Sequence, residues 1–123
     1  MNKIREQLKD RWLDYWEKNR SWIIPSCRYN GYRKTADNGR RPRSDFIIVV
    51  LTVLSNQFAL TWLEILYSLN SNEDDIIKAL GLDFDPDIEL KKREEEREKL
   101  EQQAHLLPVE NEQKKLPESS EEE

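Results

Sequence analysis

The sequence has one cysteine, one histidine and three glycines among its 123 residues. With Cys27 alone, the chain cannot form an intramolecular disulfide, and it cannot supply a CxxC motif or a cysteine-rich zinc site. We therefore expect a reducing, cytoplasmic location. The one histidine, His105, lies in a charged segment, where a solvated surface side chain is expected rather than a general base or a metal ligand.

Long hydrophobic runs are also absent. The longest, "FIIVVLTVL" at Phe46–Leu54, has nine residues, whereas a membrane-spanning helix needs about 20. The first residues, "MNKIREQLKDRW", mix charges without the apolar stretch of a signal peptide. The sequence thus predicts a soluble protein without a membrane span.

No catalytic constellation can be assembled from these residues. There is no glycine-rich phosphate loop, no HExxH motif and no Ser-His-Asp set. The acids of residues 73–75 are explained by helix capping, and Asp83, Asp85 and Asp87 lack the loop and closing glutamate of a calcium hand. We expect a non-enzymatic protein with no catalytic residues, metal site or cofactor.

Charge divides the chain into two parts. Residues 1–82 carry 13 Lys+Arg against 10 Asp+Glu, net +3, whereas residues 83–123 carry 7 against 15, net −8. Apolar residues also become scarce after the first part. We predict a helical domain at residues 1–87, a charged solvated helix at 88–107 and a disordered acidic tail at 108–123.

Helical periodicity begins near the N-terminus. Apolar residues between Lys3 and Ile23 recur on one side, and Trp12 and Trp16, one turn apart, are expected in the core. Pro25 is expected to end this helix, because the residue before a proline is disfavoured in helical geometry.

The middle of the chain predicts two further helices. Ser44 is the expected N-cap of the first. Periodicity at residues 46–54 fits a buried helix or a buried strand, and we favour a helix because no other apolar segment could pair with a strand. Residues 57–70 predict a central helix buried on nearly every side.

Capping signals define the last helices. Asn70, Ser71 and Asn72 are expected to end the preceding helix and to cap a short one, because three acids follow Ser71 in its first turn. Gly81 is expected to end that short helix, and Asp85 with Pro86 is expected to begin the charged helix. The predicted fold is an all-α, small single-domain helical bundle of about four core helices.

A basic, turn-rich loop at residues 26–43 interrupts the helices. Asn30-Gly31 and Asp37-Asn38-Gly39 predict a short hairpin or two successive turns. The loop has six cations against one acid, net +5. The candidate partner-binding residues are Arg28, Tyr29, Tyr32, Arg33, Lys34, Arg40, Arg41 and Arg43.

Two functions fit this loop. We favour a protein-interaction module, an accessory or regulatory factor that binds an acidic protein partner through the loop and its adjacent aromatic face. The alternative is a small DNA- or RNA-binding regulator whose cations contact phosphates while its tyrosines stack on bases. A third reading is structural, with Arg40, Arg41 and Arg43 pairing with the carboxylates of "NEDD" and "DFDPD". The oligomeric state stays open.

Three stretches carry a resemblance: "LKDRWLDYWEKNRSWI", the Gly-Arg-Arg-Pro segment with Ser44, and "LNSNEDDIIKALGLDFDPD". In their order and spacing, over residues 8–87, the chain resembles an uncharacterised cyanobacterial family, a domain of unknown function. The resemblance implies a small helical, cytosolic domain from a photosynthetic bacterium and carries no activity.

Overall fold

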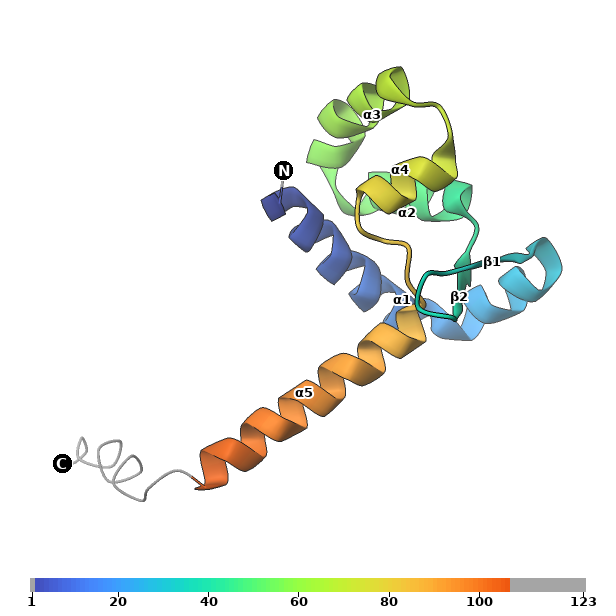
Figure 1. Cartoon of the computed structure of the whole chain (residues 1–123). Coiled ribbons are helices and arrows are strands. Elements are labelled where there is room, and N and C mark those ends of the chain that lie inside the picture. The colour runs from blue at the N-terminus through green and yellow to red at the C-terminus, as the bar shows by residue number, and fades with distance from the viewer. Residues whose placement is uncertain (1, 107–123) are drawn as a thin grey trace. The chain divides into compact units, whose positions relative to one another are not determined.

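A computed structural model describes residues 2–106 of the chain (Figure 1). The described part is helical apart from one two-stranded hairpin, which confirms a small, mostly helical fold. The elements in chain order are α1 (Asn2–Asn30), β1 (Tyr32–Lys34), β2 (Arg40–Pro42), α2 (Ser44–Leu54), the π-helix η1 (Phe58–Trp62), α3 (Leu63–Leu69), α4 (Glu73–Ala79) and α5 (Pro86–Leu106).

The chain divides into two compact units, Met1–Leu90 and Lys91–Glu123. The first unit contains the hydrophobic core and the first turn of α5. In the second, the charged helix expected at residues 88–107 is present as the rest of α5, where Arg97 forms ion pairs with Glu94 and Glu101. The acidic tail predicted at 108–123 lies outside the described residues.

The core is built around one side of α1. Trp12 and Trp16 are buried as predicted, with ring centroids 6.0 Å apart. The Trp16 indole N–H also donates to Asp87 at the start of α5 (2.8 Å), and Arg20 pairs with the same carboxylate (2.9 Å). These bonds fasten the first turn of α5 to the middle of α1.

The prediction that Pro25 ends the first helix is wrong, because α1 continues through Pro25 to Asn30. A proline inside a helix lacks one backbone N–H and bends the axis, and α1 changes direction in its second half (Figure 1). Burial of Ile23 and Cys27 on either side of the proline offsets that cost. The helix ends at Gly31 (φ 102°), whose N–H donates to the Cys27 carbonyl. The first residues of the predicted loop are therefore helical.

The apolar segment after the hairpin forms the helix α2, as predicted. Its N-cap is Arg43, in an extended conformation, and not Ser44. The reason is that the Ser44 hydroxyl is engaged elsewhere: it donates to the carboxylate of Asp74 at the start of α4.

Residues 57–70 are not the centrally buried helix that their composition suggested. Phe58 and Leu66 are buried, but Leu60 is 79% and Leu69 is 78% exposed. The segment begins as a π turn, in which the Leu63 N–H donates to the Phe58 carbonyl five residues earlier. Only one side of η1 and α3 packs on the core, so the opposite apolar side faces solvent.

The remaining caps follow the sequence closely. Of the three residues expected to cap α4, Asn72 is the one that does so, because its side chain accepts the Asp75 N–H (3.0 Å). Gly81 (φ 76°) follows the helix as expected. Asp85 caps α5 by accepting the Asp87 N–H (2.9 Å), and Pro86 is the first helical residue.

The two sides of η1 predict different responses to truncation. Phe58→Ala removes a fully buried ring and should lower the free energy of unfolding by about 3–5 kcal/mol. Leu60→Ala, at an exposed position two residues away, should change it by no more than about 0.5 kcal/mol. Urea unfolding followed by circular dichroism measures both, and equal losses would contradict the packing described.

Candidate partner interface at the hairpin end

The basic loop folds into an antiparallel hairpin that pairs Tyr32 with Pro42, Arg33 with Arg41 and Lys34 with Arg40. Directly paired residues project to the same face of a two-stranded sheet. Arg33 and Arg41 therefore share one face, and Lys34 and Arg40 share the other. Asn38 (φ 66°) forms the tight turn between the strands. The hairpin prediction is confirmed.

Arg41 fastens one face of the hairpin to the rest of the unit. Its side chain is only 2% exposed, and its Nε donates to Asp83 Oδ1 (3.0 Å). Its guanidinium also lies 4.0 Å from the carboxylate of Asp74, which Arg33 approaches to 3.6 Å. The pKa of Asp74 is lowered, first by the Ser44 hydroxyl and then by these two arginines, while burial opposes the shift. Arg41 therefore makes the ion pairs that the structural reading expected, and its side chain is buried within this unit.

A close backbone contact holds the turn against the start of α5. The Arg40 N–H donates to Asp85 Oδ2 (2.9 Å), and the Asp37 carboxylate accepts the Asp85 N–H (3.0 Å). A Cβ atom on Gly39 would lie 2.4 Å from Cβ of Asp85, so only glycine fits there. Burial opposes ionisation of Asp37, but hydrogen bonds from the Thr35 hydroxyl and the Asp85 backbone outweigh it and lower its pKa.

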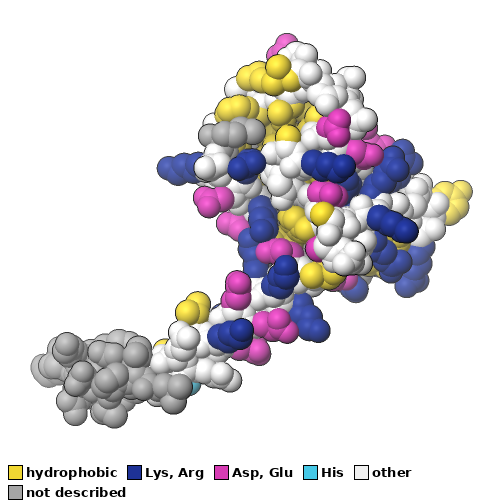
Figure 2. Space-filling view, in the orientation of Figure 1, with side chains coloured by type: hydrophobic (Ala, Val, Ile, Leu, Met, Phe, Trp, Pro, Cys, Tyr) yellow, Lys and Arg dark blue, Asp and Glu magenta, His cyan; other side chains and the backbone are white. Residues whose placement is uncertain are grey.

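Most of the other candidate residues are exposed, but Tyr32 is partly buried against the core. Arg28 and Lys34 are exposed and have no ion-pair partner among the described residues. Arg40 lies over the Tyr32 ring, 4.2 Å from its centroid, which leaves its charge at the surface. Arg43 is half-exposed and pairs with Asp45 (3.2 Å). Lys and Arg side chains gather where α1 ends and β1 runs (Figure 2).

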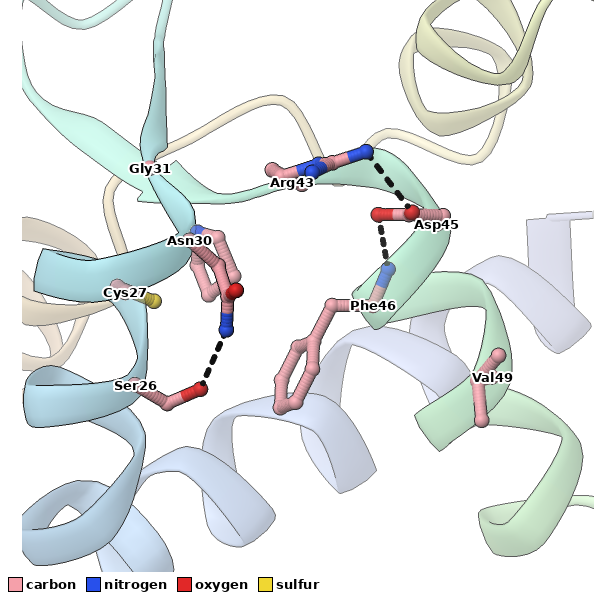
Figure 3. Close-up of a pocket in the computed structure, with 9 residues that line it drawn as sticks. Ser26, Cys27, Asn30, Gly31, Arg43, Asp45, Phe46 and Val49 are labelled. Carbon is pink, nitrogen blue, oxygen red and sulfur yellow. Dashed lines mark hydrogen bonds and ion pairs between the residues drawn. The ribbon is translucent and has the colours of Figure 1, made fainter.

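Beside these cations lies a hollow of about 350 Å³ between the last turns of α1 and the first turns of α2 (Figure 3). The Cys27 thiol, on the α1 side, has a pKa raised by burial, so it stays protonated. The lining residues are Ser26, Cys27, Asn30, Gly31, Pro42, Arg43, Asp45, Phe46 and Val49.

Aromatic side chains lie on the same two helices as the hollow. Trp22 is half-exposed and packs edge-on against Phe46, with ring centroids 6.0 Å apart. Tyr29 is 91% exposed. Together with Tyr15, these two residues of α1 recur every seven positions, about two helical turns, which places them along one side of the helix. We use the name hairpin end for the surface formed by Trp22, Tyr29, the residues that line the hollow, and the cations Arg28, Lys34, Arg40 and Arg43. Trp22, Phe46 and Val49 were not among the candidate residues, although the seven-residue spacing was a readable signal.

Two further findings concern metal binding and membrane spanning. Within residues 2–106, no group of three His, Cys, Asp or Glu side chains is arranged to hold a metal ion. In the same part of the chain, no helix is both long enough and apolar enough to cross a bilayer.

The fold and this surface define a small helical domain with a β-hairpin inserted between its first two helices. The chain belongs to the family described as "Family of unknown function (DUF5331)", whose sequence model matches residues 1–113. The expected membership of a family of unknown function is thereby confirmed, over a longer stretch than residues 8–87. No curated protein and no solved structure matches the chain.

The buried arginine gives a stability prediction. Arg41→Met keeps the side-chain volume but leaves the largely buried Asp83 carboxylate without its partner, which should cost about 3 kcal/mol. Lys34→Met, an equal change at an exposed position of the same hairpin, should shift the free energy of unfolding by no more than about 0.5 kcal/mol. Chemical denaturation of both variants tests this, and an unchanged Arg41→Met protein would refute a structural role for the ion pair.

Three carboxylates also predict loss of stability in acid. The pKa values of Asp37, Asp74 and Asp87 are lowered, that of Asp87 mainly by its bond to Arg20. Their contribution is complete above the unfolded value of 3.8 and is lost as the pH falls through the lower folded values. Unfolding free energies between pH 7 and about pH 3 should therefore decrease most steeply below about pH 4.

A matched pair of variants tests whether Asp87 contributes to this loss of stability in acid. Asp87→Asn should flatten the decrease, whereas Asp14→Asn, which removes a carboxylate from an exposed ion pair with Lys18, should not. Identical pH profiles for the two variants would show that Asp87 does not contribute.

Proposed function

We propose that the chain is a non-enzymatic interaction module that binds an acidic protein partner at the hairpin end. One observation carries the proposal: a mostly apolar hollow is lined by Phe46 and by the half-exposed cation Arg43, and the half-exposed Trp22 packs on Phe46. Aromatic residues and arginine are enriched in protein interfaces, and an apolar pocket beside them accepts an anchoring side chain.

The arrangement of the arginines supports this surface. Arg41 and Arg33 are directed toward Asp74 and Asp83, and they fix the hairpin in place. The opposite face keeps Lys34 and Arg40 at the surface, and Arg28 in the last turn of α1 is exposed as well. Interfaces built on preformed surfaces lose less conformational entropy on binding. The outer cations therefore lie on a hairpin whose position is fixed before a partner binds.

An acidic partner with an apolar anchor fits these features better than a charged polymer alone. The anchor would enter the hollow while carboxylates of the partner approach the exposed cations Arg28, Lys34 and Arg40. Complementary charge of this kind chiefly increases the association rate and the specificity. A regulatory or accessory role in the cytoplasm of a photosynthetic bacterium, as the family resemblance implies, belongs to the same proposal.

A nucleic-acid-binding regulator is the second candidate, and one observation favours it. Tyr29 is 91% exposed next to Arg28, an arrangement suited to stacking on an unpaired base. The burial of Arg41 and the pairing of Arg33 and Arg43 reduce the number of cations free to contact phosphates. We therefore place this candidate second.

Charge reversal tests the interface. The full-length protein is used as bait in an extract of its native host, alongside Arg28→Glu/Lys34→Glu. Both positions are exposed, so folding should be kept. A partner retained by the wild-type chain should bind the reversed variant at least about tenfold more weakly, equivalent to about 1.4 kcal/mol. Titration of the purified partner measures the difference.

Two controls give this test its specificity. Lys91→Glu/Lys92→Glu makes the same charge change on exposed positions of α5 and should leave binding unchanged. Val49→Trp enlarges a side chain that lines the hollow and should weaken binding without any change in charge. If all variants retain the same proteins, the hairpin end is not the interface. If instead a random single-stranded oligonucleotide binds with an affinity that falls steeply with salt, the second candidate is supported.

A further inference from the structure

The size of the hollow limits what it can hold. Its volume is about 350 Å³, near the lower end of the range of about 300–1,000 Å³ for sites that bind small organic molecules. A hollow of this size has room for one large side chain and not for a folded element. The residues that line it determine which side chain fits.

The α2 side of the hollow is suited to an aromatic ring. The Phe46 ring lines the hollow, and Trp22 packs edge-on against the same ring. Aromatic rings attract one another in edge-on or offset geometry by more than their buried area accounts for. An aliphatic side chain would fill the same space without this attraction.

The α1 side of the hollow is polar. Figure 3 shows the side chains of Ser26 and Asn30 on one side and the Phe46 ring on the other. The Asn30 Nδ2 donates to Ser26 Oγ (3.2 Å), while Asn30 Oδ1 accepts no hydrogen bond from the described residues. An apolar side chain seated here would displace water from Oδ1 and leave the oxygen without a donor, which opposes binding. The hollow therefore favours an aromatic side chain that carries a donor, as tyrosine and tryptophan do.

Charge near the hollow indicates what flanks that side chain. Arg28 lies in the same last turn of α1 as Cys27 and Asn30, is exposed, and has no ion-pair partner among the described residues. Arg43 lines the hollow itself, where Asp45 pairs with it. Carboxylates close in sequence to the aromatic side chain would therefore meet the unpaired charge of Arg28.

We propose that the hollow binds a tyrosine or tryptophan side chain from a segment with acidic residues on both sides of it. It rests on the proposed function, because it names the feature of the acidic partner that the hairpin end recognises. Phe46 packs against the ring, and Asn30 Oδ1 accepts the phenol O–H or the indole N–H. Asn30 is thus the residue that distinguishes these side chains from phenylalanine and leucine.

Synthetic peptides test the anchor. A fluorescein-labelled acidic peptide carries Tyr, Trp, Phe or Leu at its centre, and the full-length protein is titrated into each up to about 1 mM while fluorescence anisotropy is measured. The tighter of the Tyr and Trp peptides should bind at least about threefold more tightly than the Phe peptide, which lacks the donor. It should bind at least about tenfold more tightly than the Leu peptide, which lacks the ring as well.

Substitution of Asn30 separates recognition of the donor from packing of the ring. Asn30→Ala removes the acceptor at an exposed position, so the Tyr and Trp peptides should lose their advantage over the Phe peptide. The affinity of the Phe peptide itself should change by less than about twofold. Asn56→Ala, the same change at an exposed position that does not line the hollow, should preserve the advantage. Circular dichroism checks that both variants keep the helicity of the wild-type chain.

The results distinguish the anchor from the acidic interface as a whole. Equal affinity for the Leu and the aromatic peptides, or an advantage that survives Asn30→Ala, would overturn the aromatic anchor. The proposed function would still stand if Arg28→Glu/Lys34→Glu weakened binding of every peptide. Absence of binding at about 1 mM would also overturn the anchor, whereas the partner captured from the host extract decides the proposed function. Peptide binding that ignores this charge reversal would contradict both.

Discussion

The buried ion pair between Arg41 and Asp83 is the contact on which the arrangement of the hairpin depends. It joins the second strand to the segment between α4 and α5, and Asp74 adds a carboxylate from the first turn of α4. A guanidinium is difficult to bury unless its donors are satisfied, and here Asp83 and the Pro42 carbonyl accept two of them. This contact and the backbone hydrogen bonds between the turn and Asp85 together fix the position of the hairpin and its outer cations.

The helices and their caps could be predicted from the sequence, because they depend on residues close together in the chain. The spacing of Trp12 and Trp16 placed both rings in the core, and the Asp85-Pro86 pair marked the start of α5. The absence of a partner segment identified residues 46–54 as a helix. These features are set by side-chain periodicity and by backbone groups within a few residues, which a sequence displays directly.

Features that depend on distant contacts were not readable. Pro25 has the local signature of a helix end, yet burial of Ile23 and Cys27 keeps the helix intact. The six cations of the loop cannot be told apart in the sequence. Arg41 differs from the others because it binds the carboxylate of Asp83, which lies 42 residues later in the chain. The π turn has no residue signature here, so the apolar sequence of η1 and α3 was read as a buried helix. The pairing of Trp22 with Phe46 was missed because it joins two helices.

Docking of the hairpin also has a consequence for local dynamics. Pro42 of β2 lines part of the hollow, and that part of its wall is complete only while the strand is held in place. The ion pair of Arg41 closes a long loop of chain. The hairpin can therefore open locally while the helices stay folded. Amide protons of β1 and β2 then exchange with solvent through that opening, and any molecule seated in the hollow slows their exchange. The affinity of such a molecule includes the free energy of closing the hairpin.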